Sequence, residues 1–241
     1  MYLRYAFGGL LLISPRDDCR QIVDAMLSTG YDEEFCVALD FSPPFVGRLM
    51  EAGFLVMSAN LSGSREDPRY VLLPKLHLSR SALFFENLHV KKSIRRFLTR
   101  YELRPDVDFN FILDRCVQIH GDDWLTPPLV DSIKEIRESA CRGSGGLSVY
   151  PTAFALYRGE KLVAGEFGIT CGKVYTSYSG YYDEANAGTV QMILTTRWLQ
   201  ARGFRFFDLG MPLDYKTGLG AVDISPEQFV ELFRGEAAGC S

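Results

Sequence analysis

Three consecutive strand-like runs constrain the fold of this chain most strongly. They are rich in Val, Phe, Tyr and Thr and cover residues 148–158, 161–171 and 173–182. The turns between them, RGEK and CGK, are short enough to join antiparallel neighbours, so we expect a β-meander. A long helix with apolar residues at helical spacing follows over 187–203, and a strand over 204–209 comes next. A meander, a crossing helix and a further strand predict an α+β fold.

The rest of the chain predicts further helices and strands around a polar joint. The tract NLSGSREDP, residues 60–68, is turn-forming, and we place a domain boundary there, with a small N-terminal α/β domain over 1–66 and a second domain over 67–241. We expect a strand at 2–14, and apolar runs lie at 69–78 and 82–88. We expect helices at 14–30 (opened by Ser14 and Pro15, stopped by Gly30), 42–53, 91–100, 108–121, 126–140 (N-cap Thr126) and 225–233 (N-cap Ser225).

Composition limits the classes of function. Hydrophobic residues make up 47% of the 241 residues and charged residues 23%, which is typical of a folded globular chain. A net charge of −4 argues against a surface built to coat nucleic acid, so any polyanion contact has to be local. The N-terminus lacks a signal-peptide pattern and no stretch is long enough to span a membrane, so we expect a cytoplasmic protein.

The cysteines and histidines give no pattern of a metal site. The thiols are far apart, form no C-x-x-C pair, and have no ligand spacing with the three histidines. We therefore expect no metal and no disulfide, with reduced thiols at positions 19, 36, 116, 141, 171 and 240.

A basic cluster is the clearest local charge feature. The segment HVKKSIRRFLTR contains five cations and no acid: Lys91, Lys92, Arg95, Arg96 and Arg100. On a helix these side chains spread over two adjoining stripes, while Ile94, Phe97 and Leu98 face the core. Such a surface can bind phosphates, and the alternative is an ordinary solvated face.

Asp208 is the main catalytic candidate. It follows two phenylalanines at the carboxyl end of an apolar strand, where side chains often face a ligand crevice. There it could accept a proton from an amine nucleophile. The alternative is a carboxylate that caps the turn at Gly210.

Two aromatic features leave alternatives open. Trp124 precedes a helix cap and is either a stacking platform or a hydrophobic staple. The tyrosines of VYTSYSGYYD alternate along a strand, as they would on the faces of a sheet or in a pocket wall. The chain has no P-loop, no G-x-G-x-x-G after a strand, no nucleophile elbow and no kinase motif set, which disfavours a general hydrolase.

Four segments in a fixed order resemble the leucyl/phenylalanyl-tRNA-protein transferases. They cover roughly residues 40–235. The matching stretches are DFSPPFVGRLMEAGFL (40–55), RSALFFENLHVKKSIRRFL (80–98), GDDWLTPPLVDSI (121–133), and the run from GEKLVAGEFGITCGKVY through NAG at 186–188 and FFDLG to LGA at 219–221. The resemblance implies a small N-terminal domain and a C-terminal domain of the acetyltransferase-like (GNAT) type.

The resemblance also implies an activity. Family members move Leu or Phe from aminoacyl-tRNA to the α-amino group of a protein that begins with Arg or Lys, which marks that protein for degradation. Because the ester of aminoacyl-tRNA is already activated, the enzyme mainly has to place the amine and manage one proton, without a metal or other cofactor. The implied partners are aminoacyl-tRNA and the acceptor protein, for a monomeric enzyme.

The resemblance assigns roles to particular positions. It implies catalytic roles for Asp208 and Tyr178. It implies substrate contacts for Trp124, Phe167, Gly210 and Asn186, and tRNA contacts for Arg80, His89, Lys91, Lys92, Ser93, Arg95 and Arg96. We expect the Asp208 carboxylate to open into an apolar pocket lined by Phe167, Tyr178 and the 211–221 loop, with the basic helix near the pocket mouth.

The sequence departs from the family at three places. The strand-end motif Asp-x-Gln is Asp208, Leu209, Gly210 here, and a usual Gly-Glu pair is Ser177 and Tyr178. The family's Trp-Trp-Ser-Pro segment falls on residues 74–77, PKLH. These changes leave three hypotheses: a divergent transferase, a non-catalytic relative that binds tRNA or peptide, and a GNAT acyltransferase with another donor, for which DEANAG is a poor phosphate loop.

Overall fold

The computed structural model describes residues 4–6, 8–142 and 146–237. In chain order its elements are β1 (Leu11–Leu12), α1 (Cys19–Thr29), β2 (Cys36–Val37), α2 (Pro43–Glu51), β3 (Leu55–Asn60), β4 (Tyr70–Lys75), β5 (Arg80–Phe84), η1 (Phe85–Asn87), α3 (Lys92–Arg95), η2 (Leu98–Arg100), β6 (Glu102–Pro105), α4 (Phe109–His120), α5 (Pro127–Cys141), β7 (Val149–Arg158), β8 (Lys161–Cys171), β9 (Val174–Tyr182), α6 (Ala187–Ala201), β10 (Phe206–Asp208), α7 (Asp214–Thr217), β11 (Val222–Ile224) and α8 (Pro226–Ala237).

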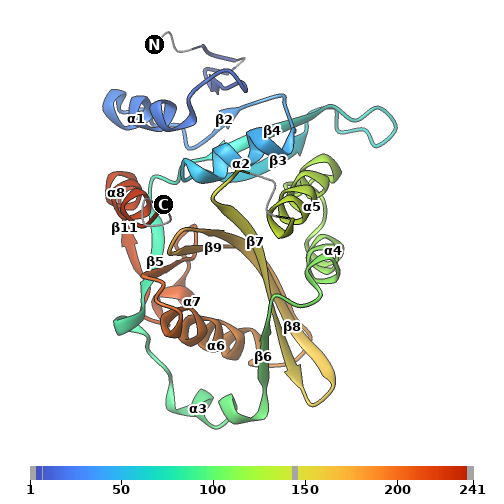
Figure 1. The fold of residues 1–241 in the computed structure, drawn as a ribbon, viewed down its shortest axis with the longest axis vertical. Helices are drawn as coiled ribbons and strands as arrows, with labels where there is room; N and C mark the ends of the chain where they lie inside the picture. Colours follow the sequence, from blue (N-terminus) through green and yellow to red (C-terminus); the bar gives the residue numbers. More distant parts are fainter. Residues whose placement is uncertain (1–3, 7, 143–145, 238–241) are drawn as a thin grey trace.

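A seven-stranded mixed sheet forms the centre of the molecule (Figure 1). Its strand order is β11-β5-β10-β9-β8-β7-β6. Strands β9 and β10 run parallel, and the other neighbouring strands run antiparallel. The predicted meander is confirmed as β7, β8 and β9, and the predicted long helix and following strand are α6 and β10. The α+β class is therefore confirmed.

Strands β9 and β10 separate partway along their length. They pair from Val174 and Phe206 to Thr176 and Asp208, whereas β9 continues along β8 as far as Tyr182. Beyond Thr176 and Asp208 the two parallel strands diverge. We call this place the splay, and it lies where β10 turns into the loop that carries α7.

Helices cover both faces of the large sheet. Helices α4 and α5 pack on one face, and α6 packs on the other (Figure 1). On the α4 face, the ring of Phe167 contacts that of Phe109, with centroids 6.4 Å apart. On the α6 face, Phe154 packs edge-on against Trp198 at 5.2 Å. Because side chains alternate along a strand, neighbours in β8 and β9 point to opposite faces.

The N-terminal part lies at one end of the large sheet, above it in Figure 1. Strands β1 and β2 form a parallel pair, and β3 and β4 form an antiparallel hairpin whose connection is the polar tract 60–68. One hydrophobic core cluster joins side chains of this part with those of α4, α5 and α8. Strands on either side of residue 66 are thus paired, and the division into 1–66 and 67–241 stays a prediction.

Two predicted elements near the N-terminus are wrong in extent. The strand expected over 2–14 is reduced to β1 and one bridge from Tyr5, and residues 2, 3 and 7 lie outside the described residues. Helix α1 begins at Cys19 rather than near Ser14, because the Asp18 side chain accepts hydrogen bonds from the N–H groups of residues 20 and 21 and so caps the helix. Gly30 ends it as predicted, in the left-handed region.

Other predictions about helix ends and thiols hold within the described residues. Thr126 is the N-cap position of α5, with proline in the first turn. The Ser225 hydroxyl accepts from the Gln228 N–H at 3.3 Å at the start of α8. Cys19, Cys36, Cys116 and Cys171 are buried and Cys141 is exposed, while Cys240 lies outside the described residues. In the described part of the chain, no helix combines the length and the apolar character that a membrane crossing requires.

Candidate functional site

Asp208 and Arg80 form a buried ion pair at the splay. The Arg80 Nε donates to Oδ1 of Asp208 at 2.9 Å, and Nη2 donates to Oδ2 at 2.6 Å. The side chains are 1% and 0% exposed. The third nitrogen of Arg80 donates to the Gly53 carbonyl at 2.9 Å, and the guanidinium lies 3.7 Å from the ring centre of Phe229. The pair therefore ties β5 and β10 to the turn before β3 and to α8.

The Asp208 carboxylate is saturated with hydrogen bonds. Besides the two bonds from Arg80, it accepts from the Gly210 N–H at 3.0 Å and from the Thr176 hydroxyl at 2.8 Å. Burial alone would raise the pKa of Asp208, but the charge of Arg80 and these four bonds outweigh it and hold the pKa below the ordinary value of 3.8. A carboxylate held in this way is a poor proton acceptor at neutral pH.

The expected placement of Asp208 is therefore wrong. Its carboxylate has no exposed surface and does not open into an apolar pocket lined by the 211–221 loop. The expectation that it caps the turn is supported by the Gly210 N–H bond. Its partners are nevertheless side chains of the splay, and two of them, Arg80 and Thr176, line a small cavity.

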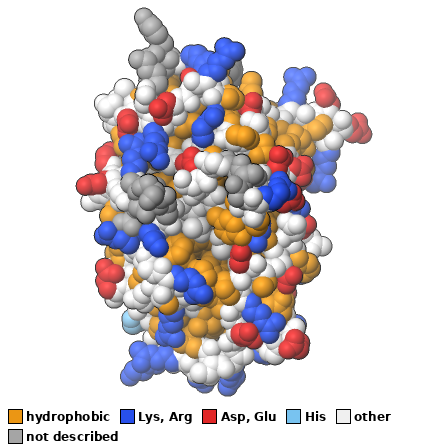
Figure 2. All heavy atoms as spheres, viewed as in Figure 1, with side chains coloured by type: hydrophobic (Ala, Val, Ile, Leu, Met, Phe, Trp, Pro, Cys, Tyr) orange, Lys and Arg blue, Asp and Glu red, His pale blue; other side chains and the backbone are white. Residues whose placement is uncertain are grey.

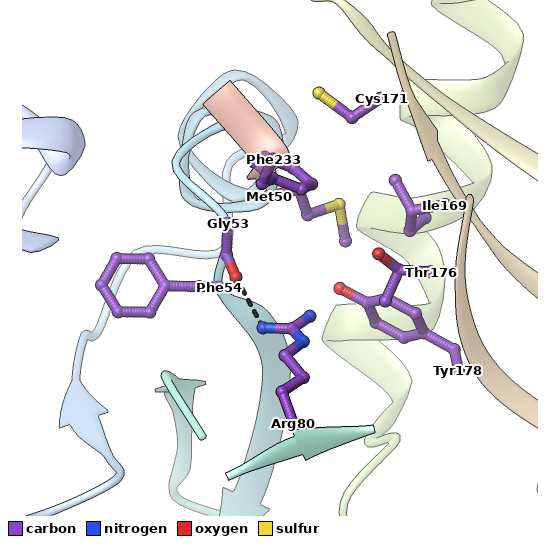
Figure 3. Close-up of a pocket in the computed structure, with 9 residues that line it drawn as sticks. All are labelled: Met50, Gly53, Phe54, Arg80, Ile169, Cys171, Thr176, Tyr178 and Phe233. Atoms are coloured by element: carbon purple, nitrogen blue, oxygen red, sulfur yellow. Dashed lines mark hydrogen bonds between the residues drawn. The ribbon is translucent and has the colours of Figure 1, made fainter. Parts of the chain in front are cut away.

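That cavity lies between the large sheet and the N-terminal part. Figure 3 shows the Tyr178 hydroxyl and the Arg80 guanidinium pointing toward the same space, beneath Met50 and Phe233. Its volume is about 10 Å³, roughly the room that one water molecule needs. The side chain of an aminoacyl group does not fit in this conformation.

Tyr178 and Phe167 lie beside the ion pair but are committed to the core. The Tyr178 hydroxyl accepts a hydrogen bond from the Val56 N–H at 3.1 Å, and burial raises its pKa well above the ordinary value. Phe167 is 0% exposed and packs against Tyr178 and the α4 helix, and its substrate contact stays a prediction. Gly210 is buried too, and its part in the site is the N–H that Asp208 accepts.

Two other predicted substrate residues do not join this cluster. Trp124 is partly buried against the main core, and its carbonyl accepts from the N–H and hydroxyl of Ser58, which places it beside β3. Asn186 is exposed at the N-cap position of α6, with φ at 68°. Neither residue contacts the Asp208 side chain, and their substrate roles stay predictions.

The predicted tRNA contacts divide into one buried residue and six exposed ones. Arg80 is buried against Asp208 and has no surface for a phosphate in this conformation, so its tRNA contact stays a prediction. The exposed residues are His89, Lys91, Lys92, Ser93, Arg95 and Arg96. Figure 2 shows Lys and Arg side chains gathered at the end of the molecule where Figure 1 places α3. These six residues remain available to a polyanion.

The basic segment is not one helix. Helix α3 ends at Arg95, and a separate turn of 3₁₀-helix, η2, follows. Ile94 is buried, and Phe97 and Leu98 pack on the same core cluster, so the chain bends to bring all three inward. Arg96 then lies over the Phe97 ring at 4.9 Å, and the two predicted stripes do not continue to Arg100.

A second polar group at the splay lies on the α6 face. Phe167 points to the α4 face, so its neighbour Glu166 points the other way, toward Tyr175 and Ser177 of β9. Glu166 is 5% exposed, and neither its Oε1 nor the Tyr175 hydroxyl makes a hydrogen bond of good geometry among the described residues. The hydroxyls of Tyr175 and Ser177 are nevertheless close enough to lower the pKa of Glu166 by weak hydrogen bonding. Burial raises the pKa of Glu166 to about 7, against the opposing effects of Ser177, Tyr175 and Lys216.

Lys216 links the second polar group to the ion pair. Its Nζ donates to the carbonyls of Leu209 and Met211 at 2.5 and 2.8 Å, which closes the loop after β10. Burial lowers the pKa of Lys216, while the charges of Asp208, Glu166 and Asp223 oppose that shift. Glu166 and Lys216 were missed from the sequence, because an alternating strand shows a lone glutamate as solvent-facing and α7 is a single turn.

His77 is a further buried group near Gly210. Its Nδ1 lies 3.7 Å from Oε1 of Glu34, and its Nε2 has no hydrogen-bond partner in the described ranges. Burial, together with the charges of Arg80 and Lys75, lowers the pKa of His77 from the ordinary value of 6.5 to about 3. The folded state therefore keeps this imidazole neutral across the range in which the unfolded chain binds a proton.

Stability is expected to fall as the pH drops from about 6.5 toward 3, because only the unfolded state gains the His77 proton there. At pH 5 this difference amounts to about 2 kcal/mol relative to pH 7. Urea unfolding of a His77→Gln variant should lack this part of the pH dependence. The exposed His120→Gln variant is the control, and an equal slope in all three proteins would contradict the assignment.

Comparison with known proteins places most of this site in one family. The family model described as leucyl/phenylalanyl-tRNA protein transferase matches residues 82–234, more than half of the chain. A relative so named from Hahella chejuensis is 26% identical over 156 residues, covering 63% of this chain and 63% of that protein. A second, from Maridesulfovibrio salexigens, is 26% identical over 171 residues and covers 69% and 64%.

Another relative of the same name extends over more of the chain. It comes from Campylobacter jejuni strain RM1221, is 22% identical over 203 residues and covers 80% of this chain and 85% of that protein. A solved structure described as L-PGS from Bacillus licheniformis has a TM-score of 0.45 at 12% identity and covers 96% of this chain and 84% of its own. The chain spans less than two thirds of the first two relatives. By the family match over residues 82–234, the chain belongs to the leucyl/phenylalanyl-tRNA protein transferase family.

Proposed function

We propose that this protein moves an aminoacyl group from aminoacyl-tRNA to the α-amino group of an acceptor protein. The observation that carries the proposal is the family match, which begins at residue 82 within β5, two residues after Arg80, and spans α3, the meander, β10 and the loop with α7. These elements hold the Arg80–Asp208 pair, the exposed basic segment and the Glu166 group. The proposal thus rests on the elements that also form the candidate site.

The residues present suit the chemistry of the reaction. An aminoacyl ester already has a good leaving group, so the protein has to hold the two reactants in place and accept one proton. The exposed cations near α3 can hold the tRNA backbone, and the splay offers buried polar groups for the reacting atoms. An overall net charge of −4 is compatible with this, because the tRNA contact is local.

The finer identity of the substrates is inferred from the family resemblance. We infer Leu or Phe as the donated residue, Arg or Lys as the N-terminal residue of the acceptor, and a role in marking that acceptor for degradation. We also infer a GNAT-like C-terminal domain and a monomeric, cytoplasmic enzyme. The names of the relatives support the donor, and the strands that diverge at the splay support a domain of this type.

A transfer assay tests the proposed function. The protein is incubated with charged Leu-tRNA or Phe-tRNA and with peptides that begin with Arg or Lys. Mass spectrometry should show that each peptide gains one residue at its N-terminus. Peptides with an acetylated N-terminus are the control, since they have no free amine. No transfer with any of the twenty charged tRNAs would overturn the proposal.

Reversing the charges of Arg95 and Arg96 to glutamate should weaken tRNA binding. Both side chains are exposed at the end of the molecule that carries α3, and the double variant replaces attraction to phosphates by repulsion. The dependence of affinity on salt should also become shallower, by about one unit of log–log slope for each phosphate that the variant no longer binds. Filter binding or fluorescence anisotropy at several salt concentrations measures both effects.

A matched control separates a local site from net charge. Arg65 and Arg69 are exposed in the connection of the β3–β4 hairpin, at the opposite end of the molecule in Figure 1. The Arg65→Glu, Arg69→Glu variant changes the net charge by the same amount as the test variant. If both variants bind tRNA equally weakly, the basic segment is an ordinary solvated face.

A non-catalytic relative that binds tRNA or peptide is the second candidate function. The observation that favours it is the sealed Asp208 carboxylate beside a cavity of about 10 Å³. This candidate predicts tRNA or peptide binding without turnover, before and after substitution at Glu166. Turnover in the transfer assay would exclude it.

A further inference from the structure

The Glu166 group has the features of a functional centre rather than of a structural contact. Its carboxylate is buried, and among the described residues its Oε1 and the Tyr175 hydroxyl beside it make no hydrogen bond of good geometry, so the carboxylate has only weak partners in Tyr175 and Ser177. Buried polar atoms in native structures usually have partners, and an unpartnered one requires an explanation. By contrast, the Asp208 carboxylate accepts four hydrogen bonds and has no oxygen left for a substrate.

Resting on the proposed function, we propose that Glu166 receives the α-ammonium group of the acceptor and takes the proton that this group loses before it attacks the aminoacyl ester. The ammonium proton passes to Glu166 and from there to the solvent. The neutral amine nitrogen then bonds to the carbonyl carbon, the bond from that carbon to the ribose oxygen breaks, and the proton that the nitrogen loses on bonding passes to the leaving ribose oxygen. The products are a peptide bond and an uncharged tRNA, and no further reactant is needed.

The position of Glu166 gives an amine a short route to it. On β9 its neighbour Ser177 is partly exposed, and on α7 its neighbour Tyr215 is 56% exposed. Tyr215 is close enough for the charge of Glu166 to raise its pKa, in addition to the effect of burial. Glu166 itself keeps 5% of its surface exposed, near these two more exposed side chains.

Proton affinity favours Glu166 over Asp208 as the group that takes the proton from the ammonium. An α-ammonium has a pKa of about 7.7–8.0. Transfer of its proton to Glu166, with a pKa of about 7, is roughly tenfold unfavourable, which a transition state can tolerate. Transfer to Asp208, whose pKa lies below 3.8, would be unfavourable by about 10⁴-fold or more.

Four other ionisable groups interact with Glu166. They are Tyr175 of β9, Tyr215 and Lys216 of α7 and Cys116 of α4. The tyrosines have raised pKa values and Cys116 has a pKa of about 12. Lys216 starts from 10.5, and burial lowers its pKa against three nearby carboxylates. Helix α6 contributes the uncharged buried side chains Gln191 and Thr195.

The first experiment measures binding, which does not depend on turnover. Affinity for a peptide that begins with Arg is measured by calorimetry between about pH 6 and 7.5, where the α-amine stays mostly protonated. In wild type, affinity should fall as the pH drops through about 7, because Glu166 becomes protonated and loses its charge. In Glu166→Gln the affinity should be lower and independent of pH. Absence of peptide binding, or an equal pH dependence in the two proteins, would overturn the proposal.

The second experiment measures single-turnover transfer. Glu166→Gln should transfer to the peptide about 10²–10⁴-fold more slowly. Hydroxylamine, an amine that is already neutral at pH 7, should take the aminoacyl group at the same rate in both proteins. A purely structural role of Glu166 would slow both nucleophiles equally and would overturn the proposal, as would unchanged transfer to the peptide.

Two further variants keep the test independent of folding. The Ser177 hydroxyl lowers the pKa of Glu166. Its removal in Ser177→Ala should therefore move the pH profile of peptide binding to higher pH than in wild type. Glu160→Gln alters an exposed glutamate in the β7–β8 turn and should leave every profile unchanged. If wild type binds the peptide with the expected pH profile but transfers nothing, the proposed function fails while the amine-binding role of Glu166 stands.

Discussion

Replacing Asp208 with alanine is expected to lower the free energy of unfolding by about 3–5 kcal/mol. The substitution leaves the Arg80 guanidinium 1% exposed without its counter-charge, and removes the acceptor of the Gly210 N–H and the Thr176 hydroxyl. Breaking one partner of a buried pair costs more than removing both, because it strands a charge in the interior. Chemical denaturation at pH 7 measures the effect.

A double-mutant cycle separates the pair from the packing around it. Arg80→Met should cost a similar amount, since it leaves the Asp208 carboxylate buried and unpaired. The double variant Arg80→Met, Asp208→Ala should lose clearly less than the sum of the two, because neither buried charge remains. Single variants that lose under about 1 kcal/mol would mean that water reaches the pair, which would restore Asp208 as a candidate base.

The pairing of Arg80 with Asp208 shows where sequence reasoning stopped. Both residues were recognised from their motifs, yet each was given a separate solvent-facing role. The two are 128 residues apart, and nothing local in either segment shows that β5 and β10 are neighbours in the sheet. A carboxylate at the end of a strand looks the same in sequence whether the strand end opens to a ligand or closes on an arginine.

The meander was predictable for a physical reason. Its turns are short and contain glycine, and its strands are long enough to show β-branched and aromatic enrichment, so local signals define the pairing. Short strands lack such signals: β1 and β2 are two residues each, and β11 is three. Their partner strands are distant in sequence, so their pairing depends on the tertiary fold and not on local signals. The basic segment has a clear local signal for one helix, but the prediction is wrong. Burial of Ile94 and its apolar neighbours bends the chain and overrides the helical pattern.

Two of the recognised sequence motifs contact each other at both ends. At the splay, Arg80 of the motif RSALFFENLHV pairs with Asp208 of FFDLG. At the other end, the His89 N–H donates to the Leu219 carbonyl at 2.8 Å, and Gly220 lies against the Asn87 carbonyl. The loop from β10 to β11, which carries Lys216 beside Glu166, is therefore held at both ends by residues 80–89. The two motifs, far apart in the sequence, therefore form one contiguous part of the fold.

Replacing Gly220 with alanine is expected to lower the free energy of unfolding by about 2–5 kcal/mol. Its φ is +99°, where a side chain is strained, and an added Cβ would lie 1.9 Å from the Asn87 oxygen. Because that atom belongs to the backbone, relief requires the 87–89 segment and the loop to move apart, which breaks the His89 to Leu219 hydrogen bond. Thermal or urea unfolding measures the loss.

Gly203→Ala is the matched control for backbone strain. Gly203 has φ at +72°, but nothing lies within 4 Å of the Cβ position, so its substitution carries the strain without the collision. We expect a loss of about 1–2 kcal/mol there. Gly220 lies in the loop that carries Lys216 beside Glu166. Gly220→Ala should therefore also slow aminoacyl transfer more than Gly203→Ala does. Equal effects of the two substitutions on stability would show that the loop is free to move away from Asn87. In that case residues 80–89 would not hold the loop with Lys216 in place.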